Sequence, residues 1–234
     1  MSVHARSGGR TLARARVVCA VVAICTVMID LVRLTQAAAG PVDVVVRDSN
    51  RKPIAETVVY ASSGSAAGAP APGLKAVVDQ QDKEFVPRVK PIQTGTAVMF
   101  PNRDDIRHHV YSFSPAKKFE LPLYKGTPAA PVKFDRPGVV VLGCNIHDWM
   151  IGYVFVLDTP YFGTTGADGR VQLTLPPGTY DVRVWHPSLR DERDAPSQRV
   201  SVGAATSEPL EFTLALKPEW RPRRAPSARG DRYR

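Results

Sequence analysis

Cys144, His147 and Met150 are the residues of this sequence whose types and spacing best fit metal chemistry. They recur every third residue in Cys144-Asn-Ile-His147-Asp-Trp-Met150, and a second source of imidazole, His108-His109, lies upstream. Two imidazoles and one thiolate with a weak axial thioether are the ligands of a blue-copper electron-transfer site. The sequence therefore predicts a mononuclear copper centre that takes one imidazole from the His108-His109 pair.

Two apolar runs flank this segment and predict how it is held. Residues 139–142 are consistent with a buried strand, Gly143 with the start of a turn, and residues 151–156 with the returning strand. A loop of this length can fold its side chains around one point. The remaining imidazole must then come from a neighbouring strand.

Cysteine usage favours a metal site over its alternatives. Cys19 and Cys25 lie in a signal-like segment, so Cys144 is the one cysteine expected in the mature chain. A lone thiol in an oxidising compartment has no internal disulfide partner, and metal binding would explain its presence. The alternatives are an inert buried thiol, a cysteine nucleophile or a zinc site. A haem attachment motif, C-x-x-C-H, is absent.

Two stretches of the chain resemble plastocyanin and amicyanin, the small cupredoxins. The first contains Phe85-Val-Pro87, Gly95, Val98-x-Phe100-x-Asn102 and His108-x-Val110, and the second contains Cys144-x-x-His147-x-x-Met150-x-Gly152-x-Val154-x-Val156. The resemblance covers roughly residues 76–157 and implies a Greek-key β-sandwich over residues 73–157. The chain as a whole also resembles periplasmic proteins labelled methylamine utilization protein or plastocyanin-like.

The resemblance implies a role for each candidate ligand. His108 takes the place of the first imidazole, Cys144 the thiolate, His147 the second imidazole and Met150 the axial ligand of a type 1 copper. His109 departs from the family, which has Asn there to tie the ligand turn to the cysteine loop. His109 would replace that tie or compete with His108 for the metal, and strand alternation allows only one of the two to face it.

Several residues near the motif have two interpretations. Trp149 and Ile146 would form a partner-docking patch around His147, or Trp149 would pack against a neighbouring domain. Asp148 is expected to be a solvated turn residue, with a hydrogen bond that tunes His147 as the alternative, and His186 is expected to be a strand-end residue, with a fifth ligand as the alternative. Met99, Tyr111 and Phe113 are expected to pack in the interior.

The two ends of the chain carry its net charge of +9. Residues 1–39 have the basic segment, the apolar run (17–29) and the Ala37-Ala38-Ala39 site of a Sec-type signal peptide, which predicts periplasmic export. An uncleaved N-terminal anchor is the alternative, and no other segment is expected to cross a membrane. Residues 217–234 form a basic tail predicted to be disordered. Residues 40–216 have equal numbers of acidic and basic residues, which argues against nucleic-acid binding.

The remaining residues predict an all-β protein with a second small sandwich. Residues 42–47, 56–60, 171–175, 180–185, 198–202 and 209–215 have strand patterns, and residues 62–73 are linker-like. They resemble a carboxypeptidase regulatory domain, with Arg51 in place of a usual Gly. The copper segment would be inserted into, or packed against, a sandwich formed by 41–72 and 158–216. Alternatively, 41–72 extends the cupredoxin.

The predicted function is one-electron transfer in the periplasm, with a dehydrogenase or a c-type cytochrome as partner. No substrate is transformed, so the protein is not expected to be an enzyme by itself. The alternatives are a copper-binding or copper-delivery protein and a non-redox β-sandwich interaction module.

Overall fold

The computed structural model describes residues 39–64, 72–128, 130–189, 195–203 and 208–218. The regular elements in these ranges are β-strands, so the all-β prediction is confirmed. None of these segments forms a helix long and apolar enough to cross a membrane. The predicted signal peptide lies outside the described residues up to residue 38, and the predicted tail does so from residue 219.

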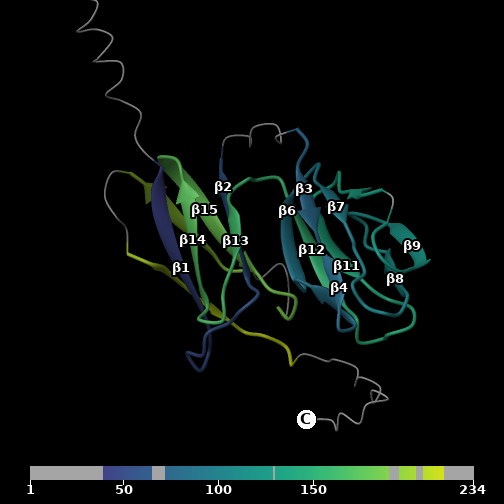
Figure 1. Ribbon diagram of the computed structural model, residues 1–234. Helices are drawn as coiled ribbons and strands as arrows, with labels where there is room; N and C mark the ends of the chain where they lie inside the picture. The colour runs from purple at the N-terminus through teal and green to yellow at the C-terminus, as the bar shows by residue number, and fades with distance from the viewer. Residues whose placement is uncertain (1–38, 65–71, 129, 190–194, 204–207, 219–234) are drawn as a thin grey trace, which may run out of the picture. The chain divides into compact units, whose positions relative to one another are not determined.

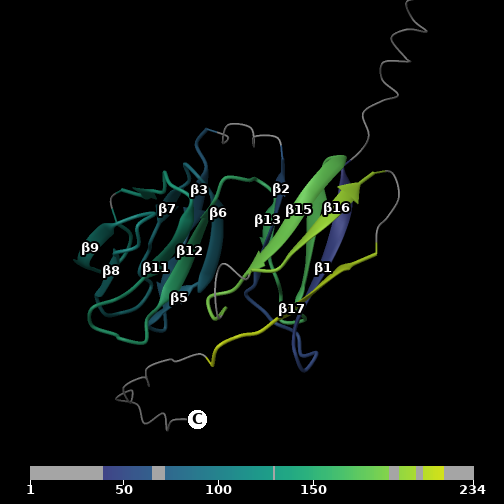
Figure 2. The same ribbon diagram turned by 180° about the vertical axis from the view of Figure 1, so that it is seen from behind.

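One group of strands joins the two ends of the described chain, and we call it the flanking sandwich (Figures 1 and 2). Its first sheet, in the order β14-β1-β17, consists of β1 (Gly40–Asp48), β14 (Arg170–Leu175) and β17 (Leu210–Leu214). Its second sheet, in the order β13-β2-β15-β16, consists of β2 (Val58–Ser63), β13 (Phe162–Thr164), β15 (Gly178–Trp185) and β16 (Ser197–Val202).

The strands between these ends pair among themselves, and we call them the central sandwich (Figure 1). One sheet, β11-β12-β6, consists of β6 (Val89–Gln93), β11 (Gly138–Leu142) and β12 (Gly152–Leu157), and another, β10-β7-β3, of β3 (Lys75–Val77), β7 (Ala97–Met99) and β10 (Val132–Lys133). Two hairpins complete it: β4 (Asp79–Gln81) with β5 (Glu84–Val86), and β8 (His108–Ser112) with β9 (Phe119–Tyr124).

Strand pairing in the flanking sandwich joins segments that are far apart in sequence. β1 pairs antiparallel with β14 and parallel with β17, and β2 pairs antiparallel with β13 and β15. The predicted linker, residues 62–73, begins inside β2, where Ser63 is the partner of Tyr180. These pairings support our proposal that residues 41–72 and 158–216 form one sandwich into which residues 73–157 are inserted.

A Gly169→Ala substitution tests this proposal, because Gly169 contacts the N-terminal half of the flanking sandwich. Its φ is +71°, and an added Cβ would lie 2.5 Å from the carbonyl oxygen of Val46. A side chain in this left-handed conformation costs about 1–3 kcal/mol before the clash is counted. We therefore expect the midpoint of urea unfolding to be lower for Gly169→Ala than for the wild type. A Gly203→Ala control, with nothing within 4 Å of its Cβ, should leave the midpoint almost unchanged. Equal midpoints for both variants would contradict the proposal.

β12 is buried on both faces, which explains its nearly continuous apolar sequence. Val154 and Val156 belong to the core of the central sandwich, whereas Phe155 and Leu157 belong to the core of the flanking sandwich. The ring of Phe155 lies 4.9 Å from that of Trp185 on β15, centroid to centroid. The two sandwiches therefore share one apolar interface.

The three residues expected in the interior differ in how far they are buried. Tyr111 packs its ring against Gly143, where an added Cβ would lie only 2.7 Å from the ring. Met99 is only half-buried, because its neighbours Val98 and Phe100 point into the core from either side of it in sequence. Phe113 is 79% exposed just beyond the end of β8, so the prediction that it packs in the interior is wrong, and its ring contacts that of Tyr111, with the centroids 5.1 Å apart.

Candidate metal centre

The predicted ligands come from two elements that a short bridge holds together. His108 begins β8, and the loop of residues 143–151 connects β11 to β12. Tyr111 and Gly143 exchange backbone hydrogen bonds of 3.1 and 3.0 Å. Gly143 is needed here because the Tyr111 ring occupies the space of a side chain. This contact brings β8 alongside the start of the cysteine loop.

His108, Cys144 and His147 converge on one point. The sulfur of Cys144 lies 4.0 Å from Nδ1 of His108 and 3.8 Å from Nδ1 of His147. The three potential ligand atoms all lie within 4.8 Å of one another, and the two imidazole centroids are 4.9 Å apart. In the described part of the chain this is the group of His, Cys and acidic residues that could hold a metal ion.

These spacings match what a bound ion requires. With metal–sulfur and metal–nitrogen bonds of about 2.3 and 2.0 Å, sulfur and nitrogen would be about 3.5–3.7 Å apart at tetrahedral to trigonal angles. The observed distances of 3.8 and 4.0 Å need only a small contraction. One thiolate with two imidazoles is a donor set for a soft or borderline transition metal. The residues therefore fit a mononuclear metal site.

The cysteine loop folds back on itself and buries Met150. The amide of Met150 donates to the carbonyl of His147 at 2.9 Å, and the amide of Ile151 donates to the carbonyl of Trp149 at 3.0 Å. Met150 is 1% exposed and belongs to the same core cluster as Cys144. Both residues also line one hollow, so Met150 lies in the neighbourhood of Cys144.

The structure distinguishes the two neighbouring histidines. His108 is fully buried, turns Nδ1 toward Cys144 and places Nε2 2.7 Å from a carboxylate oxygen of Asp104. His109 places its Nε2 2.9 Å from Glu120, and its Nδ1 is buried without a hydrogen-bond partner. His109 therefore faces away from the ligand group. A tie to the cysteine loop, one of the two roles considered for His109, is provided by the backbone of Tyr111.

The surroundings of His147 favour its neutral, metal-binding form. Burial lowers the pKa of His147, repulsion from His108 in its protonated form and from Lys83 lowers it further, and Asp104 opposes the shift. A neutral imidazole is the form that binds a metal. Burial also raises the pKa of Tyr124 to about 12, and the Cys144 thiolate adds to that shift.

His147 is the most exposed of the three candidate ligands. His147 is half-buried, and the neighbouring Ile146 is 50% exposed. The half-buried Trp149 has its ring centroid 5.2 Å from that of His147 and lines a hollow with Tyr153 of β12 and with Pro187, which lies after β15. Trp149 therefore lies beside His147, as the first interpretation requires, and borders a hollow whose far side includes residues next to the flanking sandwich.

Two other residues behave as the sequence predicted. Asp148 is an exposed turn residue. His186 follows the last residue of β15, and its Nδ1 accepts the amide of Ser188 at 3.1 Å. The important residue that the sequence interpretation missed is Asp104. It lies in an irregular turn, where no periodicity relates residue 104 to residue 108.

Comparison with known proteins gives matches among solved structures. No family model matches the chain, and no curated protein does. One structural match is the copper-containing nitrite reductase of Thermus scotoductus, at 27% identity over 41% of this chain, with a TM-score of 0.33. This chain spans only 24% of that reductase.

Two smaller proteins match over almost their whole length. A purple cupredoxin of Nitrosopumilus maritimus is 23% identical over 35% of this chain and 99% of its own, with a TM-score of 0.31. A single-site mutant of amicyanin in its oxidised state is 24% identical over 42% of this chain and 99% of its own, with a TM-score of 0.33. The chain is similar to cupredoxins.

Proposed function

We propose that this chain is a type 1 copper protein that carries single electrons between redox partners. The observation that supports this most directly is the convergence of Nδ1 of His108, Sγ of Cys144 and Nδ1 of His147. Met150 would be the weak axial ligand. A bound copper ion would supply the one-electron couple.

The surroundings of the donor atoms favour electron transfer over copper delivery. His108 is fully buried and Cys144 is 4% exposed, so a bound ion would be shielded from solvent and would exchange slowly. Backbone hydrogen bonds hold both ligand segments in place without a metal. A fixed donor set limits rearrangement when the charge of the ion changes. No substrate is transformed in this proposal.

The route for electrons would pass through His147. This imidazole is the most exposed of the three ligands, and Ile146 beside it offers apolar surface for a partner. A periplasmic dehydrogenase or a c-type cytochrome would be such a partner. The signal-like sequence of residues 1–39 supports a periplasmic location.

The visible absorption spectrum of the mature protein loaded with Cu(II), beside that of Cys144→Ser, tests the proposal. We expect an intense thiolate-to-copper band that disappears in the variant, because serine provides no thiolate. Ser and Cys differ little in size, so the fold should survive, and far-UV circular dichroism checks this. A colourless protein that binds only Cu(I) would support copper delivery and contradict electron transfer.

A further inference from the structure

We propose that Asp104 is a positioning residue of the metal centre, which fixes the ring of His108 and stabilises the oxidised ion by its charge. This inference rests on the proposed function for its redox consequence. The claim that Asp104 fixes the ring of His108 depends only on hydrogen bonds that form without a metal.

Asp104 determines which nitrogen of His108 faces the ligand group. A carboxylate only accepts hydrogen bonds, so Nε2 of His108 donates to it over 2.7 Å. The proton therefore resides on Nε2, and Nδ1 is left with a free lone pair directed toward Cys144. The His108 side chain is fully buried and that of Asp104 is 14% exposed, so water competes little for this bond.

Asp104 is itself held by the turn between β4 and β5. The amides of Asp82 and Lys83 donate to its two carboxylate oxygens at 2.8 and 2.9 Å. Both residues have positive φ, 53° and 60°, which directs successive amides to one side of the turn. Burial alone would raise the pKa of Asp104, but the hydrogen bonds from His108 and the two amides outweigh it and lower the pKa.

A second set of hydrogen bonds fixes the turn that carries Asp104. The amide of Asp104 donates to the side-chain oxygen of Asn102 at 3.0 Å. The side-chain nitrogen of Asn102 donates to the carbonyls of Ile106 and Tyr124, each at 2.9 Å. Asn102 therefore ties the turn to β9, and the carboxylate has few alternative positions.

The negative charge of Asp104 has a redox consequence. A carboxylate bonded to a ligating histidine increases the basicity of the imidazole, and loss of such a partner typically weakens metal binding by about 10–100-fold. The more highly charged ion benefits more from this electron donation. Asp104 should therefore favour Cu(II) over Cu(I) and lower the reduction potential.

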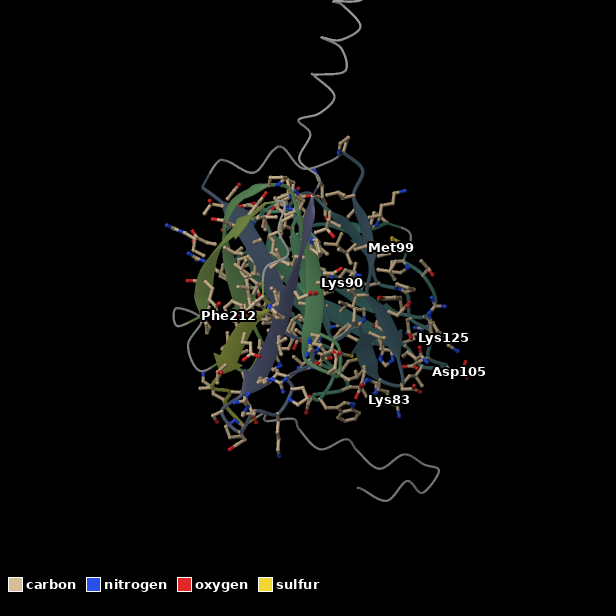
Figure 3. The ribbon with its side chains drawn as sticks, turned by 90° about the vertical axis from the view of Figure 1, so that its left-hand side faces the viewer. Lys83, Lys90, Met99, Asp105, Lys125 and Phe212 are labelled. Carbon is tan, nitrogen blue, oxygen red and sulfur yellow. The ribbon has the colours of Figure 1, made fainter. Side chains whose placement is uncertain are left out.

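Asp104→Asn, compared with Asp105→Asn, tests this inference. Asp105 is exposed and its carboxylate pairs with Lys125 at 3.3 Å, so its variant removes the same charge from the same turn (Figure 3). We expect Asp104→Asn to weaken the binding of Cu(II) relative to that of Cu(I) by about tenfold, which raises the reduction potential by about 59 mV. Asp105→Asn should change it much less. Equal shifts of the reduction potential in the two variants would mean that Asp104 acts only as a nearby negative charge, and this would overturn the inference.

Imidazole nitrogen NMR of the metal-free protein gives a readout that needs no copper. We expect a slowly exchanging Nε2 proton on His108 in the wild type and in Asp105→Asn, and its loss or rapid exchange in Asp104→Ala, which removes the acceptor. Asp104→Glu keeps the charge and should recover much of the potential. A protected Nε2 proton in Asp104→Ala would contradict the positioning role.

The two proposals can fail separately. A wild-type protein without the thiolate band would refute the proposed type 1 site, while the imidazole proton would still report on Asp104. Conversely, a normal band with an unprotected Nε2 proton in the wild type would leave the proposed function standing and refute the role of Asp104.

Discussion

His108→Ala is expected to abolish the thiolate-to-copper absorption band, whereas His109→Gln is expected to keep it. His108 directs Nδ1 toward Cys144, and removing it leaves one imidazole and one thiolate, which cannot complete a trigonal set. Copper affinity should fall by more than the 10–100-fold typical for loss of an outer partner.

His109→Gln is the matched control, because it changes the adjacent buried histidine. Its Nε2 bonds to Glu120, and a Gln amide can donate the same bond. Its Nδ1 has no hydrogen-bond partner to lose. Copper titration followed by visible absorption measures both variants, and chemical denaturation of the metal-free proteins shows whether they fold. If His109→Gln lost the band while His108→Ala retained it, the ligand assignment would be wrong.

Trp185→Ala is expected to lower the free energy of unfolding by about 3–5 kcal/mol, the usual cost of truncating a large buried aromatic residue. Trp185 is 4% exposed, and its ring centroid lies 4.9 Å from that of Phe155 and 6.0 Å from that of Tyr153, both on β12. The cavity would therefore open between β15 of the flanking sandwich and β12 of the central one. Both sandwiches should lose stability.

Phe113→Ala is the control for this experiment, because it removes an aromatic ring that is 79% exposed. Its effect should stay within about 0.5 kcal/mol. Urea denaturation followed by far-UV circular dichroism should give a single transition for the wild type, since β12 contributes side chains to the cores of both sandwiches. Two separate transitions, with only one of them moved by Trp185→Ala, would contradict this coupling through β12.

Much of the strand content was predictable because side-chain alternation and short apolar runs are local information. The predicted strand at residues 171–175 is β14, Arg170–Leu175, and that at 139–142 is β11, Gly138–Leu142. The resemblance also placed Gly where Arg51 stands, and Arg51 has a φ of +63°, the conformation that a glycine adopts readily. The turn pattern in the sequence thus indicated a left-handed backbone conformation at this position, although an arginine and not a glycine occupies it.

Residue type and spacing alone determined the candidate donor set, because a thiolate, an imidazole and a thioether within one short loop must lie close together. The apolar runs on either side determined that this loop joins two strands. These inferences depend on neighbours in sequence, where the covalent chain limits the possible distances.

Tertiary structure alone decided which imidazole completes the set and what holds it. The choice of His108 over His109 depends on a bridge from Tyr111 to Gly143 and on the partners Asp104 and Glu120. The pairing of β1 with β14 and β17 likewise joins segments more than 100 residues apart. Such contacts arise from the packing of the whole chain, which no local pattern specifies.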